Sequence, residues 1–203
     1  MSRGSIDKSE DYRKPVSSQA ELSKEVSKIL FRERLIIIIG EIDARQAERI
    51  SAQLLSLDLE DSKKEITILL DSGQGDLQFG YTIHNLIKAI ESKVKIIATG
   101  TLAQVAVVIY LSVPKKNRLS LPLTKFLIHQ PVGDARGQAS DLHILAEVIL
   151  KTREWLNRLI AEETGQSYES VSRDTQRDHW MDALEAHKYG LVGKVIKKIG
   201  KVI

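Results

Sequence analysis

Three short runs of aliphatic residues constrain the fold of this chain more than any other feature. They cover residues 35–39, 66–70 and 94–98 and recur about 30 residues apart. An apolar run of this length, without polar alternation, is typical of a strand buried on both faces of a parallel sheet. Residues 43–57 and 77–90, between the runs, carry apolar side chains at the spacing of an amphipathic helix. Strands that alternate with helices in this way predict the α/β class.

The rest of the chain is predicted to add smaller elements and one long helix. We expect short helices over 20–29, 168–174 and 182–189, strands over 119–121 and 126–128, and β structure over 191–202. Residues 105–113 are rich in β-branched side chains, but their place after a strand and a glycine turn predicts a buried helix. The helix that begins at Ser140 and ends at Gly165 should be about 36 Å long at about 1.5 Å per residue. We expect so long an apolar-striped helix to project and contact a partner.

Composition restricts the classes of protein that this chain can belong to. A length of 203 residues predicts one domain, and the absence of cysteine excludes disulfides and thiolate metal sites. The spacing of the five histidines predicts no metal site, and we expect no cofactor. No apolar run is long enough for a membrane span, and residues 1–19 are polar and without a signal core, so a cytoplasmic or organelle protein is expected.

The lysine-rich tail over residues 194–201 has two interpretations. Four lysines are interleaved there with valine and isoleucine, while the net charge of the whole chain is only +3. The favoured interpretation is an edge strand kept soluble by its lysines. A weaker alternative is a basic patch that binds nucleic acid, which salt-sensitive binding would reveal. We therefore expect neither nucleic acid nor membrane as a partner.

Three residues stand where a hydrolase would carry its catalytic groups, but one has the wrong chemistry. Gln104 follows a strand and a glycine turn, which is a usual place for a nucleophile, and an amide cannot attack a carbonyl. His129 follows an apolar strand, and Asp178 lies further along the chain, so the two could act as base and orienting carboxylate. The loop that contains Gly75 either presents backbone N–H groups to an oxyanion or simply turns the chain.

Several segments together make the chain resemble the ClpP-type serine peptidases, over about residues 29–195. The matching segments are Arg32-Glu33-Arg34-Leu35-Ile36-Ile37, Ala52-Gln53-Leu54-Leu55, Ile128-His129-Gln130-Pro131, Gly137-Gln138-Ala139-Ser140-Asp141-Leu142, Thr164-Gly165-Gln166, Arg173-Asp174-Thr175-Gln176-Arg177-Asp178 and Glu185-Ala186-His187-Lys188-Tyr189-Gly190-Leu191-Val192. The resemblance implies a crotonase-like α/β fold of repeated ββα units, a single domain over 20–203 and a handle helix within about 132–165. It also implies heptameric rings stacked in pairs, axial loops over 1–19, and an AAA+ ATPase that threads unfolded protein into the chamber.

The resemblance also assigns the site residues one at a time. The general base falls on His129, the orienting aspartate on Asp178, and the nucleophilic serine on Gln104. The oxyanion-hole positions fall on Gly75 and Val105. The neighbourhood of Gln104 departs from the family pattern too, because Ala103-Gln104-Val105-Ala106 stands where the family has Ala-Ser-Met-Gly.

Two further departures concern assembly. The strand over residues 66–70 lacks the tyrosine that the family uses for ATPase docking, which predicts weakened docking by this subunit. Gln176 replaces an acidic residue of the family's ring-to-ring contact, which predicts a weaker or heterotypic contact.

These features together predict a ClpR-like, non-catalytic subunit that joins an active ClpP-type paralogue, itself, or both in heptameric rings. Two alternatives stay open from the sequence. One is an enzyme of acyl-CoA chemistry on the same crotonase-like fold, whose paired N–H groups would hold an enolate oxyanion. The other is an active peptidase with an unconventional nucleophile.

Overall fold

A mostly parallel sheet forms the centre of the protein. The computed structural model describes residues 19–131 and 139–200. The strands are β1 (Leu35–Ile39), β2 (Ile66–Ser72), β3 (Val94–Ala103), β4 (Arg118–Ser120), β5 (Lys125–Ile128), β6 (His179–Asp182) and β7 (Lys194–Val195). The main path runs β1-β2-β3-β4-β7 and is parallel throughout. Strand β5 pairs in parallel with the later part of β3, and β6 pairs antiparallel with β5. This arrangement confirms the α/β prediction.

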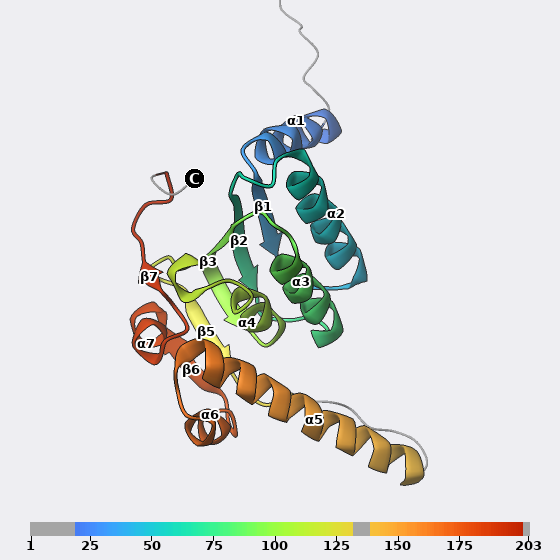
Figure 1. Ribbon diagram of the computed structural model, residues 1–203, viewed down its shortest axis with the longest axis vertical. Helices are drawn as coiled ribbons and strands as arrows, with labels where there is room; N and C mark the ends of the chain where they lie inside the picture. The colour runs from blue at the N-terminus through green and yellow to red at the C-terminus, as the bar shows by residue number, and fades with distance from the viewer. Residues whose placement is uncertain (1–18, 132–138, 201–203) are drawn as a thin grey trace, which may run out of the picture.

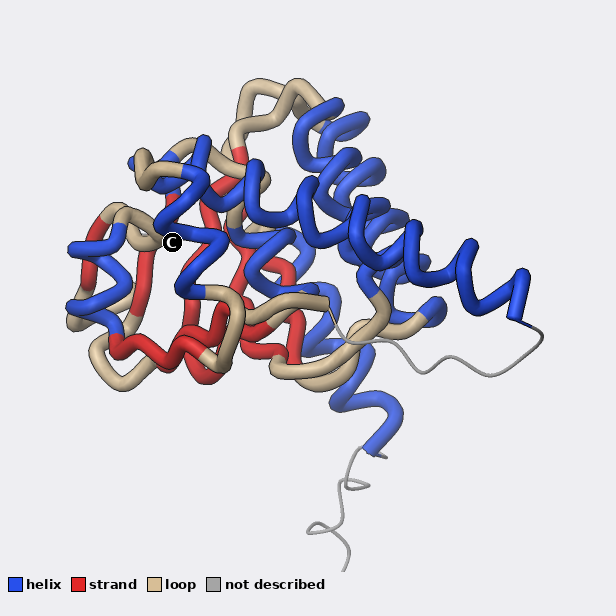
Figure 2. Tube along the Cα trace, turned by 90° about the horizontal axis from the view of Figure 1, so that it is seen from below, coloured by secondary structure: helices blue, strands red, loops and turns tan. Residues whose placement is uncertain are grey.

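Helices cover the sheet and one of them leaves it (Figure 1). The helices are α1 (Gln19–Arg32), α2 (Ala44–Glu60), α3 (Leu77–Ala89), α4 (Val105–Tyr110), the 3₁₀ helix η1 (Lys115–Asn117), α5 (Ala139–Thr164), α6 (Tyr168–Asp174) and α7 (Ala183–Tyr189). The core lies between the sheet and α2, α3 and α4, and every side chain of α4 is buried. Helix α5 has 26 residues and runs out from the body, as Figures 1 and 2 show. The predicted projecting helix is therefore confirmed.

Local sequence explains where several helices begin. Asp43 caps α2 by accepting a hydrogen bond from the Gln46 backbone N–H at 2.7 Å. Asp182 caps α7 in a complete capping box with Glu185. The buried helix predicted after the glycine turn is present as α4, but it ends at Tyr110 rather than at residue 113.

Further boundaries differ from the sequence prediction, and strand β3 continues to Ala103 rather than ending at residue 98. Of the β structure expected over 191–202, the described residues form one short strand, Lys194–Val195, which pairs with Leu119 and Ser120 of β4. Strand β7 is an edge strand, as expected for the lysine-rich tail. Helix α1 extends to Arg32, beyond the predicted end at residue 29. The axial-loop prediction for residues 1–19 falls almost wholly outside the described residues, as do residues 132–138 of the predicted handle.

No helix within 19–131 and 139–200 combines the length and apolar character that crossing a bilayer would need.

Candidate functional site

The candidate site lies where β2 and β3 end. These strands are parallel neighbours, and Ser72 is in register with Leu102 after a shift in the ladder. The turns that follow both strands therefore lie at one edge of the sheet, and α3 and α4 begin from them. The two helices approach closely there, since a Cβ built on Gly80 would lie 2.6 Å from a side-chain methyl of Val105. This edge is where open α/β sheets place their ligands.

Gln104 occupies a strained turn between β3 and α4. Its φ of 45° and ψ of −104° lie outside the regions that a residue with a Cβ readily adopts. Its carbonyl accepts the Val108 N–H at 3.2 Å, but its side chain makes no capping hydrogen bond. The backbone thus has the sharp strand-to-helix turn that displays a nucleophile, while the side chain displayed is an amide.

Asp71 holds this turn from the neighbouring strand, and sequence analysis missed it. Its carboxylate accepts the Thr101 N–H at 2.8 Å. Gly100 is required beside it, because a Cβ there would collide with the same carboxylate. The sequence does contain a signal for this role of Asp71. A carboxylate follows the aliphatic run over residues 66–70, and the next strand carries a glycine, Gly100.

His129 shares a shallow hollow with Gln104. The hollow is lined by Gln104, Val107, Leu127, Ile128, His129, Leu156 and Ile160. Two residues 25 positions apart (129 − 104) thus line one hollow. The Nδ1 atom of His129 is 2.8 Å from the carbonyl oxygen of the adjacent Gln130, so this nitrogen carries the proton and donates to that carbonyl.

Asp178 is near His129 by strand register but does not hydrogen-bond to it. The last pair of the β5–β6 ladder joins Ile128 to His179, so the next residues, His129 and Asp178, face each other. Asp178 is exposed, and the described residues contain no hydrogen bond between its carboxylate and the His129 ring. The orienting role assigned to Asp178 stays a prediction.

The two residues predicted to form an oxyanion hole differ in their backbone setting. Gly75 has a φ of +144° and forms a bridge with Ile42, whose carbonyl oxygen would lie 2.7 Å from an added Cβ. Only glycine fits that position. Val105 is the first residue of α4, where the N–H has no acceptor within the helix. The side chain of Ala106, where the family has glycine, is fully buried.

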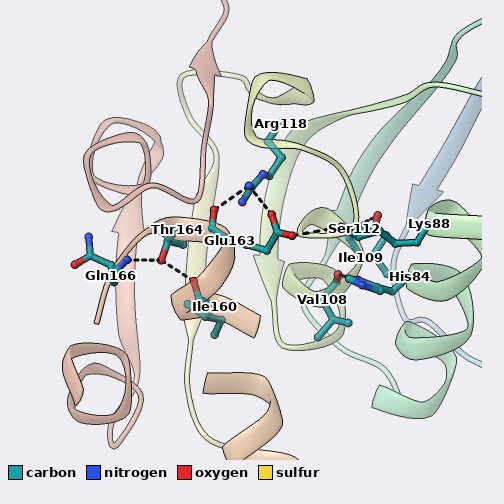
Figure 3. A network of polar contacts seen from close by, with 10 residues as sticks. All are labelled: His84, Lys88, Val108, Ile109, Ser112, Arg118, Ile160, Glu163, Thr164 and Gln166. Atoms are coloured by element: carbon teal, nitrogen blue, oxygen red, sulfur yellow. Dashed lines mark hydrogen bonds and ion pairs between the residues drawn. The ribbon is translucent and has the colours of Figure 1, made fainter. Parts of the chain in front are cut away.

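A buried polar network supports α4 and the base of α5 (Figure 3). His84 of α3 is 7 % exposed, and its Nδ1 donates to the Val108 carbonyl at 2.8 Å. Burial lowers the pKa of His84, so the ring is neutral near pH 7. Arg118, at the start of β4, donates to Glu163 near the end of α5. This arginine and this glutamate were not singled out in the sequence.

No cluster of three or more potential metal ligands occurs among the side chains of the described residues.

Comparison with known proteins agrees with this geometry. Residues 18–199 match the family model described as Clp protease. The chain is 38 % identical over 195 residues to "ATP-dependent Clp protease proteolytic subunit 3" of Rhizobium meliloti, covering 96 % of this chain and all of the relative. It is 37 % identical over 186 residues to the "ATP-dependent Clp protease proteolytic subunit" of Ligilactobacillus salivarius, covering 92 % of this chain and 94 % of the relative.

A solved structure has the same fold. The structure of a ClpP1 point mutant from Listeria monocytogenes superposes with a TM-score of 0.81 and 42 % identity, covering 88 % of this chain and 99 % of the other. The family match spans nearly the whole chain, and the parallel sheet, the turn at Gln104 and the long α5 all fit it. The chain therefore belongs to the Clp protease family of ClpP-type proteolytic subunits.

Proposed function

We propose that this protein is a non-catalytic subunit of an ATP-dependent Clp-type protease, assembled into heptameric rings with an active ClpP-type paralogue. The observation that carries the proposal is Gln104 in the strained turn, half-buried beside His129. A histidine activates a serine by taking the proton of its hydroxyl group. The carboxamide of Gln104 offers no group that becomes a nucleophile in this way. Loss of one member of a catalytic triad already costs several orders of magnitude in rate.

The surroundings of Gln104 support loss of the peptidase reaction. His129 donates its Nδ1 proton to the neighbouring carbonyl of Gln130, and Asp178 is exposed and does not bond to the ring. The oxyanion-hole positions Gly75 and Val105 would still border the site. We propose that this subunit forms part of the chamber wall at the position where its paralogue carries a catalytic site.

Exposed apolar side chains on α5 support assembly with other subunits. Ile144, Val148 and Leu150 are 61 %, 52 % and 60 % exposed on a helix that leaves the body. Large apolar side chains that gather on one projecting element are typical of a surface that a partner covers. In this proposal α5 is the handle that joins two rings.

The ATPase is proposed to dock mainly on the paralogue. Strand β2 carries no tyrosine, and its sequence over residues 66–70 is mostly aliphatic. The proposed partners are therefore an AAA+ Clp ATPase, unfolded protein substrates and the paralogue. A location in the cytoplasm or in an organelle matrix belongs to the same proposal.

The test combines native mass spectrometry with labelling by a serine-reactive fluorophosphonate. The tagged protein, purified from its own source organism, is expected in a complex of about fourteen subunits, together with a second subunit that alone takes the label. The Gln104→Ala variant should assemble and behave as the wild type, because the amide contributes no nucleophile. Peptide hydrolysis by the isolated protein that Gln104→Ala abolishes would refute the proposal.

A further inference from the structure

A second concave site lies between α3 and α5, separate from the Gln104 hollow. It is an open groove of about 390 Å³. Its lining consists of Tyr81, His84, Asn85, Lys151, Thr152 and Trp155. None of these residues lines the hollow beside Gln104, although α5 contributes side chains to both. The volume falls in the range of small-ligand sites.

A buried imidazole in the lining of this groove has a hydrogen-bond acceptor without a partner among the described residues. His84 is 7 % exposed, and its Nδ1–H is used by the Val108 carbonyl at 2.8 Å. In a neutral imidazole the other nitrogen then carries a lone pair. No described residue donates to that Nε2 atom, while the His84 side chain lines the groove. A ligand that donates an N–H or O–H would satisfy it.

Two aromatic rings provide an apolar wall. The Tyr81 and Trp155 centroids are 4.7 Å apart with planes at 74°, the edge-to-face arrangement that aromatic pairs prefer. Trp155 is still 41 % exposed. A further aromatic ring placed against it would remove that surface from water.

Lys151 supplies the only formal charge of the groove lining, and that charge is uncompensated. The nearest acidic residues along α5 have other partners: Glu147 pairs with His143 at 3.4 Å, and Glu154 pairs with Arg158 at 2.7 Å. Within the described part of the chain, Lys151 forms no ion pair, and no carboxylate lines the groove. The groove therefore combines a cation, a neutral acceptor and an aromatic wall.

We propose that this groove binds the C-terminal residue of a short peptide that ends in tyrosine or tryptophan. The terminal carboxylate would pair with Lys151, the ring would lie against Trp155, and the phenol O–H or indole N–H would donate to Nε2 of His84. Hydrolysis of any peptide bond creates such a free carboxylate, so the ligand class is a product of peptidase action. The proposal does not depend on whether Gln104 is inactive.

The test uses the full-length protein with Trp180→Phe, which leaves Trp155 as the only tryptophan. Trp155 emission is followed while N-acetyl-Gly-Tyr, its C-terminal amide, or N-acetyl-Gly-Phe is added, with calorimetry as a second readout. We expect saturable binding of the tyrosine peptide and a Kd about threefold higher for the amide, because one exposed ion pair is lost. We expect a Kd about threefold higher for the phenylalanine peptide, which lacks the donor to His84.

Two lysine variants locate the carboxylate contact. Lys151→Met should make the acid and the amide bind equally. Lys88→Met is the matched control, because Lys88 lies on α3 outside the groove, and it should keep the preference for the acid. The proposal is overturned if Trp155 does not respond to millimolar peptide, if the wild type binds acid and amide equally, or if Lys151→Met keeps the preference. Gln104→Ala should change none of these values.

Discussion

The link between Arg118 and Glu163 offers the sharpest test of what holds the projecting helix to the body. Arg118 is 1 % exposed, and its Nη2 donates at 2.9 Å both to the backbone carbonyl and to Oε2 of Glu163 (Figure 3). Burial lowers the pKa of Arg118, and the adjacent carboxylate of Glu163 opposes that shift. A charge buried to this degree depends on its partner.

Glu163→Gln removes that partner's charge at almost constant size. Removing one member of a buried ion pair costs about 3–5 kcal/mol. The Glu163 side chain is 23 % exposed, so water can partly solvate Arg118 once the carboxylate is gone. We therefore expect a loss at the lower end of that range, about 3 kcal/mol in the free energy of unfolding. Lys88 also contacts Glu163, at 3.3 Å, but its side chain is 47 % exposed. Lys88→Met should therefore cost less than about 1 kcal/mol.

Urea unfolding at a fixed protein concentration, followed by tryptophan fluorescence, measures these differences. The double variant Arg118→Met with Glu163→Gln should recover at least about 1 kcal/mol relative to the sum of the single changes, because no buried charge is left unpaired. A Glu163→Gln cost within about 0.5 kcal/mol of zero would refute the reasoning, since surface changes alone reach that size. The reasoning would also be refuted if Lys88→Met cost as much stability as Glu163→Gln. The stabilisation would then come from the exposed Lys88–Glu163 pair.

Two further predictions concern the loops around the site and the acid side of the stability curve. Gly75→Ala should destabilise the fold by at least about 2 kcal/mol, because its Cβ would lie 2.7 Å from the Ile42 carbonyl oxygen and the backbone has a φ of +144°. Gly40→Ala is the control, because Gly40 has a φ of +86° but open space around it. It should cost about 1 kcal/mol in the same unfolding assay. Asp58 accepts the Ser92 N–H at 2.7 Å, and this hydrogen bond is the largest cause that lowers the pKa of Asp58. Its contribution to stability is present above the unfolded-state pKa of about 3.9 and is lost as pH falls through the lower folded-state pKa. Asp58→Asn should therefore reduce the slope of the unfolding free energy against pH in this acid range. An unchanged slope would contradict the role given to the Asp58–Ser92 hydrogen bond.

The sequence predicted the elements whose signals are local. Five consecutive aliphatic residues over 35–39 specify a strand covered on both faces, and Asp43 with its helical stripe fixes the start of α2. The strand expected over 191–202 failed for a related reason. A strand exists only where a neighbour pairs with it, and among the described residues the ladder with β4 covers Lys194 and Val195.

Part of the candidate site was also visible in the sequence. The identity of Gln104 predicts that its side chain is no nucleophile, and the strand and glycine before it predict a turn at this position. The direction of the His129 ring did not follow. Its Nδ1 bonds to the carbonyl of the adjacent Gln130 rather than to Asp178, and that choice depends on where the packing of the strands places Asp178 relative to the ring.

The sequence by itself determined the class of the fold, the projecting helix and the chemistry that position 104 cannot perform. These depend on side-chain type and on periodicity over one or two turns, which are local properties. Only the tertiary structure decided that Tyr81 and Trp155 form one wall, and that Arg118 depends on Glu163. Such contacts join residues 45 or more positions apart, since 155 − 81 is 74 and 163 − 118 is 45. Their formation depends on how helices and strands pack, which no local pattern encodes.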